Sequence, residues 1–272
     1  MTGPGDLRIE DVTITYPARK GQVHALALPR LHLAPGSFTA VIGPSGCGKS
    51  SLLNAIAGFV APTSGRILLD GAPVTGPSAR IGVIFQHYAL FPWFTALGNV
   101  RFALRRFPLS RAEEIARARA ALDEVGLGAH ARKFPQQLSG GMRQRVAIAR
   151  TFACAPEVLL LDEPFAALDA QTRRGMQELM LAVWARHSAT VLLVTHDVDE
   201  ALLLADRVLL MSAAPGRLIG EYLLPQPRPR RLTQDGGALL ALREDILARL
   251  HPFSAPLDAP ADAAPAPERS LP

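Results

Sequence analysis

This sequence of 272 residues lacks long apolar runs: none reaches the roughly 18 residues that a membrane-spanning helix requires. Its first ten residues lack the basic and then apolar pattern of a secretory signal. Cysteine is scarce as well, because Cys47 and Cys154 are the only two and cannot form a disulfide framework. These features favour a reduced cytosolic protein.

Runs of five or more basic residues are also missing, although the formal net charge is +5. The excess consists of arginines scattered along the chain, which favours a solvated surface over a nucleic-acid-binding patch. Attraction to anionic lipid headgroups is a second interpretation of the same charge. We therefore expect no nucleic-acid partner.

A phosphate-binding motif, G-x-x-x-x-G-K-[ST], is present at residues 43–51. Its glycines allow a tight turn that brings backbone N–H groups close to phosphate oxygens. Lys49 is expected to reach the β- and γ-phosphates, and Ser50 to ligate Mg²⁺. We expect the whole loop to contact the nucleotide, namely Gly43, Pro44, Ser45, Gly46, Cys47, Gly48, Lys49, Ser50 and Ser51.

The flanking residues supply the context that this motif requires. An apolar strand is predicted over residues 38–42, and a helical pattern over 52–57 ends at Gly58. Other strand-like segments alternate with helical ones, which predicts a mainly parallel α/β sheet. These predicted strands cover residues 7–15, 23–33, 66–70, 81–85, 158–161, 190–195 and 207–212.

Helical patterns dominate residues 87–156, which we interpret as an insertion between two strands of the sheet. Ser110 and Glu113 form the pattern of a capping box, and Gly126 ends that helix. Asp197 is predicted to cap a later helix, with Glu200 three residues on. Residues 253–272 are rich in proline and alanine, which predicts a disordered tail.

Asp162 and Glu163 follow the apolar run of residues 158–161. They would therefore lie at the carboxyl end of a strand, where open α/β sheets bind ligands. Asp162 would hold Mg²⁺ directly or through water, and Glu163 could act as a general base toward the attacking water. An exposed acidic turn is the alternative interpretation.

A further anion-binding signal lies at residues 138–145, Leu-Ser-Gly-Gly-Met-Arg-Gln-Arg. Ser139, Gly140 and Gly141 begin a predicted helix, where a hydroxyl and free N–H groups can face an anion. On chemistry alone an ordinary helix cap explains these residues equally well.

Taken together, these motifs make residues 7–220 resemble the ATP-binding subunit of ABC transporters. The order and spacing of the motifs carry the resemblance. Ser51 departs from the pattern, since threonine is usual there, but Ser50 keeps the metal-binding hydroxyl. The matching segments are Walker A (43–51), the Q-loop (Gln86), the signature (138–144), Walker B with its glutamate (162–163), the D-loop (167–169) and the H-loop (His196).

The resemblance implies a P-loop NTPase of ABC type: a mainly parallel core sheet, an antiparallel β subdomain and a helical insertion. It implies one ATPase domain over residues 1–252, with the helical subdomain at about 87–156. ATP and Mg²⁺ are the implied cofactors. The implied catalytic residues are Glu163, His196 and Gln86, and the implied metal ligands are Ser50, Gln86 and Asp162. Tyr16 would stack on the adenine ring. The further implied ATP contacts are Ser139, Gly140, Gly141 and Asp169.

The resemblance also implies partners. Two subunits would close head to tail around two ATP molecules, with Ser139 and Gly141 completing the site of the other subunit. An integral membrane permease would hold this homodimer at the cytoplasmic face of the membrane and serve a periplasmic or lipid-anchored solute-binding protein. Residues 88–94, Tyr-Ala-Leu-Phe-Pro-Trp-Phe, would contact the permease or, alternatively, belong to the core of the insertion.

Several segments look most like the nitrate, sulfonate and taurine importers, notably residues 85–100, 162–173 and 195–201. Importers of thiamine-precursor pyrimidines look similar. Two other classes of protein fit the sequence less well. A soluble ABC ATPase acting on DNA or ribosomes would carry tandem cassettes or long coiled-coil insertions, and a purely regulatory nucleotide-binding module would not need Glu163 and His196.

Overall fold

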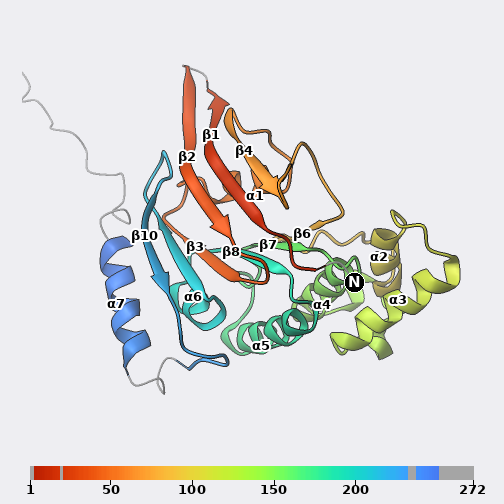
Figure 1. Ribbon diagram of the computed structural model, residues 1–272. Helices are drawn as coiled ribbons and strands as arrows, with labels where there is room; N and C mark the ends of the chain where they lie inside the picture. The colour runs from red at the N-terminus through yellow and green to blue at the C-terminus, as the bar shows by residue number, and fades with distance from the viewer. Residues whose placement is uncertain (1–2, 19–20, 232–236, 251–272) are drawn as a thin grey trace, which may run out of the picture.

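The structure is a computed structural model that describes residues 3–18, 21–231 and 237–250 (Figure 1). It contains two sheets. The first is antiparallel, with strand order β2-β1-β4-β5. Its strands are β1 (Leu7–Pro17), β2 (Gln22–Leu33), β4 (Ser64–Leu69) and β5 (Ala72–Pro73).

The second sheet has six strands in the order β10-β9-β3-β8-β7-β6, and all pairs are parallel except that of β10 with β9. Every residue of β3 and of β8 is buried, and in β7 only Asp162 is not. Such buried runs are typical of parallel strands covered on both faces. The strands are β3 (Phe38–Ile42), β6 (Ile81–Ile84), β7 (Val158–Asp162), β8 (Thr190–Thr195), β9 (Arg207–Met211) and β10 (Leu218–Leu223).

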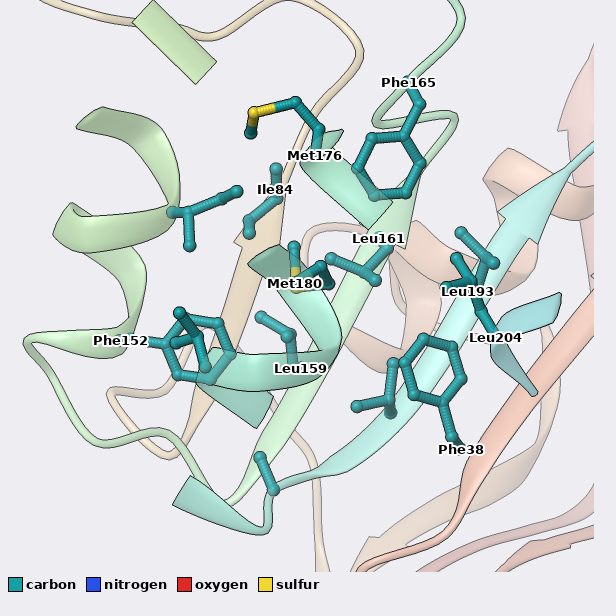
Figure 2. Close-up of a cluster of buried hydrophobic side chains, with 14 of the residues drawn as sticks. Phe38, Ile84, Phe152, Leu159, Leu161, Phe165, Met176, Met180, Leu193 and Leu204 are labelled. Atoms are coloured by element: carbon teal, nitrogen blue, oxygen red, sulfur yellow. The ribbon is translucent and has the colours of Figure 1, made fainter. Parts of the chain in front are cut away.

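Two hydrophobic clusters cover the two faces of this sheet, because successive side chains of a strand point in opposite directions. Leu159 and Leu161 belong to one cluster, and Leu160 between them belongs to the other. Figure 2 shows the first cluster, in which Phe38, Phe152 and other side chains meet between the helices and the sheet. The second cluster joins the sheet to the antiparallel sheet and to α1 (Lys49–Ile56).

The predicted helical insertion is present, and its helices begin at Ala96. Thr95 caps α2 by accepting a hydrogen bond from the Gly98 N–H at 3.1 Å, so the residues before it form a loop. Ser110 and Glu113 form the predicted capping box. The insertion comprises α2 (Ala96–Leu104), α3 (Arg111–Glu124), 3-10 turns at Gly128–His130 and Pro135–Gln137, and α4 (Gly140–Phe152).

Three helices follow, α5 (Ala170–His187), α6 (Val198–Leu204) and α7 (Ala238–Leu250). Strand β10 and helix α7 have no counterpart among the predicted elements. Leu239 and Ile246 of α7 are fully buried against the first cluster, and α7 lies beside α6 (Figure 1). The predicted tail at 253–272 lies outside the described residues. Within the described part of the chain, no helix is long and apolar enough to span a membrane.

Candidate nucleotide site

The phosphate loop connects β3 to α1, as the motif requires. Gly48 precedes the helix with φ of 94°, a conformation that L side chains rarely adopt. A Cβ atom there would lie 2.4 Å from the Ala25 carbonyl oxygen of β2. Only glycine therefore fits this position, and the loop stays close to the antiparallel sheet.

Lys49 is folded back into this loop and is only 7% exposed. Its ammonium group donates to the carbonyl oxygens of Gly43 at 2.7 Å and Pro44 at 2.8 Å. Cys47 is 1% exposed, with its Sγ 3.6 Å from Lys49 Nζ. Ser45, Gly46 and Ser50 are exposed, so the outer rim of the loop can receive an anion.

Tyr16 lies near the end of β1, beside the phosphate loop. Its hydroxyl donates to Ser51 Oγ at 3.3 Å, and its ring packs partly against the second hydrophobic cluster. The antiparallel sheet thus brings this aromatic residue to the start of α1, 35 residues away in sequence.

The carboxyl ends of β7 and β8 carry the next group of predicted residues. Asp162 pairs in register with Val194, so Glu163 and His196 follow neighbouring strand ends. Burial raises the pKa of Asp162, and the adjacent Glu163 carboxylate raises it further, while Lys49 opposes both effects. A carboxylate in that environment is strongly stabilised by a nearby cation.

Glu163 Oε2 lies 3.1 Å from His196 Nδ1. The backbone of Glu163 has φ of 45°, which is unusual for a residue other than glycine. Its N–H donates to the Val194 carbonyl at 2.9 Å, and this bond holds the unusual conformation in place. Strained backbone of this kind is often found at functional sites.

Gln86 is exposed and follows β6 by two residues, as Glu163 follows Leu161 of β7 by two. Because Ile84 and Leu161 pair in register, Gln86 and Glu163 reach the same edge of the sheet. Ser50, Gln86 and Asp162 offer hard oxygen donors, which suit Mg²⁺. No group of three or more His, Cys, Asp or Glu residues forms a metal cluster among the described residues, and Mg²⁺ typically needs only one or two carboxylates beside the phosphates.

A second group of predicted residues lies at the starts of α4 and α5. Ser139 caps α4 by accepting from the Met142 N–H at 3.3 Å, and Asp169 caps α5 by accepting from the Thr172 N–H at 2.9 Å. A Cβ at Gly141 would lie 3.0 Å from Thr172 Cγ2, so these two helix starts are adjacent. Within the described residues, no hydrogen bond or ion pair joins this group to the phosphate loop.

The structure adds residues that the motifs did not indicate. A small cavity of about 50 Å³ is lined by Glu163, His196, Arg173 and Glu200, together with Phe165, Ala166, Thr195 and Asp197. Glu200 is 4% exposed, and burial raises its pKa from 4.5 to about 7. Asp197 caps α6 as predicted, whereas the Glu200 side chain turns inward toward Thr195 and Gln177.

A phosphate loop between β3 and α1, with Asp162 and Glu163 at the end of β7, which β8 separates from β3, defines a P-loop ATPase. The ABC transporter family model matches residues 28–166. The chain therefore belongs to the ABC transporter family, as the signature and the other motifs predicted, and it is an ATP-binding, ATP-hydrolysing member of it.

Related proteins agree with this assignment. The chain is 47% identical to the "Nitrate import ATP-binding protein NrtD" of Synechocystis, over 81% of this chain and 83% of that protein. It is 46% identical to the "Taurine import ATP-binding protein TauB" of Pseudomonas putida, over 90% and 95% respectively. The solved structure described as "Dimeric Structure of MJ0796, a Bacterial ABC Transporter Cassette" matches with a TM-score of 0.71 and 32% identity, covering 81% of this chain and 100% of that one.

Proposed function

We propose that this chain is the ATPase subunit of an importer and hydrolyses MgATP to drive a small anionic solute, such as nitrate, taurine or a sulfonate, through a separate permease. The observation that carries the proposal is the Glu163–His196 contact at 3.1 Å beside the phosphate loop, because it supplies a base and its partner for hydrolysis. The names of the relatives support the solute class.

The proposal gives each predicted site residue a role. The loop N–H groups and Lys49 bind phosphates, and Tyr16 contacts the adenine ring. Ser50, Gln86 and Asp162 would hold Mg²⁺, which neutralises phosphate charge when bound. Glu163 accepts a proton from the attacking water, and His196 contacts the γ-phosphate. Replacement of Glu163 by Gln keeps the shape but removes the proton acceptor.

Glu163→Gln should therefore lower ATP turnover by about 10²–10⁴-fold while ATP binding persists. An ATP-held dimer should accumulate, because hydrolysis no longer separates the subunits. Turnover and nucleotide binding are measured on the same preparation. Near-normal turnover in this variant would remove Glu163 from the proposed role.

The second group, Ser139, Gly140, Gly141 and Asp169, is proposed to complete the ATP site of a second copy of the chain. The absence of hydrogen bonds or ion pairs from this group to the phosphate loop within the described residues supports that arrangement, as does the dimeric state named for the related cassette. Head-to-tail pairing places Lys49 of one chain and Ser139 of the other at one ATP.

Mixed dimers test this pairing. Lys49→Ala and Ser139→Arg are prepared separately in a Glu163→Gln background, so each homodimer carries two damaged sites. A mixed dimer has one intact site and one doubly damaged site, so mixing should restore ATP-dependent pairing. Pairing no better than the average of the two homodimers contradicts the head-to-tail model.

The loop over residues 88–94 is proposed as the permease contact. Trp93 is 67% exposed, and Phe102 of α2 is also exposed. Phe91 packs between them, with ring centroids 5.6 Å from Trp93 and 4.6 Å from Phe102. Both sequence interpretations therefore have support: Leu90 packs against the first hydrophobic cluster, to which the insertion contributes, while Trp93 faces solvent. The permease would hold the subunit peripherally at the cytoplasmic face of the membrane.

The transport role is tested by co-purification with candidate permeases and reconstitution into liposomes with the matching solute-binding protein. Nitrate, taurine and an alkanesulfonate are offered one at a time, and ATP turnover and solute uptake are measured together. One of these anions should stimulate both, and Glu163→Gln should abolish both. Turnover that no permease or solute alters would argue against an importer subunit.

A further inference from the structure

Arg173 lies in the first turn of α5, between two loops of the nucleotide site. Its Nη2 donates to the Leu168 carbonyl oxygen of the D-loop at 2.9 Å. Its Nη1 lies 3.6 Å from Asp197 Oδ2, directly after His196. One guanidinium therefore contacts both loops, which its planar fork of donors makes possible.

The Asp197 end of this contact is itself fixed in place. Asp197 Oδ1 accepts hydrogen bonds from the N–H groups of Asp199 at 2.9 Å and Glu200 at 3.2 Å. The Asp197 N–H donates to Thr195 Oγ1 at 3.1 Å. Because His196 lies between Thr195 and Asp197, these bonds restrain its backbone on both sides.

The Leu168 end is restrained as well. Leu168 is largely buried, and its N–H donates to the Phe165 carbonyl at 3.2 Å. The next residue, Asp169, caps α5. A shift of the D-loop would therefore displace the Arg173 guanidinium, and so would a shift of the His196 loop.

We propose that Arg173 is a positioning residue that joins the D-loop to the His196 loop, so that His196 meets Glu163 correctly only when the D-loop is in place. The proposal rests on the proposed function, in which the D-loop faces the second subunit. ATP hydrolysis by one chain then depends on contact between its own D-loop and the partner subunit. Arg173 acts through the backbone and touches neither Glu163 nor His196 in any hydrogen bond or ion pair of the described residues.

Arg174 supplies a matched control. It is the next residue on the same helix, but its side chain is exposed, and its Nε donates to Glu178 Oε1 at 3.3 Å on the helix surface. Arg173→Met and Arg174→Met each remove one positive charge and keep an unbranched side chain in place of the aliphatic part of arginine. Only the first removes the connection between the two loops.

Steady-state kinetics distinguish positioning from nucleotide binding. Arg173→Met should lower kcat about 10- to 100-fold, because a small displacement of reacting groups is costly. The KM for ATP should stay within about twofold, and Arg174→Met should leave both parameters unchanged. Arg173→Lys keeps the charge but replaces the planar fork, in which Nη2 and Nη1 reach the two loops separately, by a single nitrogen on a shorter side chain; its kcat should therefore fall between those of the wild type and Arg173→Met.

Hydrogen exchange tests the connection without relying on activity. In nucleotide-free protein, Arg173→Met should speed exchange in peptides covering residues 164–169 and 196–201, and Arg174→Met should not. Unchanged exchange in both peptides, or an unchanged kcat, overturns the proposal. If Arg173→Met does not fold, Arg173→Lys decides through the same two measurements. If the wild-type protein does not hydrolyse ATP, the proposed function is refuted. The hydrogen-exchange result would still show whether Arg173 connects the two loops.

Discussion

Glu200 gives the protein a pH-dependent stability that can be calculated. Its carboxyl group is buried at the start of α6, and this burial raises its pKa from 4.5 to about 7. Asp197 raises the pKa as well, whereas hydrogen bonds to Thr195 and Gln177 and the charge of Arg173 lower it. The ionised form is therefore disfavoured in the folded protein.

The direction in which the free energy of unfolding changes with pH follows from this raised pKa. Below about pH 4.5 the carboxyl is neutral in both the folded and the unfolded chain, so its burial carries no ionisation cost. Between about pH 4.5 and pH 7 the unfolded chain ionises this carboxyl while the folded protein keeps it protonated, so stability falls as the pH rises and levels off once the pH exceeds 7. The full cost well above pH 7 is about 3 kcal/mol, of which about 1 kcal/mol is added between pH 6 and pH 8.

Glu200→Gln keeps the size and removes the titration. The free energy of unfolding is measured in urea at pH 6 and pH 8 for the wild type, Glu200→Gln and the exposed control Glu178→Gln. The stability of Glu200→Gln relative to the wild type should improve by about 1 kcal/mol between the two pH values. Every other titratable group is common to both proteins, so the comparison isolates the Glu200 carboxyl. A difference that does not change with pH refutes the reasoning, as would an equal improvement in Glu178→Gln.

Three further changes test other parts of the structure. Asn99→Ala should destabilise the protein by about 3 kcal/mol in urea unfolding, because this buried amide makes four hydrogen bonds to the backbone of residues 91–95. Ser110→Ala should cost about 1 kcal/mol by the same measurement, since it removes the helix cap of α3. Maleimide should react slowly with both cysteines of the native protein, because Cys47 is buried and because burial raises the pKa of the Cys154 thiol. Denaturant should make both react quickly. Fast labelling of the native protein would contradict the described burial.

The motif residues could be predicted from sequence because each depends on local structure. The phosphate loop needs only a strand before it and a helix after it, and Asp162 needs only to follow a buried strand. Ser110 and Glu113 are three residues apart, so their capping box is visible directly. The burial of β3, β7 and β8 follows from their continuous apolar composition.

The residues that sequence reasoning missed depend on contacts between distant segments. Arg173 gains its Asp197 partner only when the start of α5 comes close to the start of α6, and Glu200 of α6 likewise meets Gln177 of α5. A pattern read along one helix cannot distinguish an arginine that connects two loops from its exposed neighbour Arg174. Helix α7 was missed for a related reason, since its two buried residues find their partners on α6 and the core cluster.

The strand order of the six-stranded sheet has a consequence for how the protein is made. Strand β3, which leads into the phosphate loop, lies between β8 and β9, although these strands end at residues 195 and 211. During synthesis, β3 therefore has no neighbour in its sheet until most of the chain has left the ribosome. The antiparallel sheet, whose strands lie within residues 7–73, can pair much earlier. Nascent chains that stall before residue 190 should thus contain the complete phosphate motif but leave β3 as an unpaired, aggregation-prone apolar strand. Chaperones and proteases should recognise such a strand.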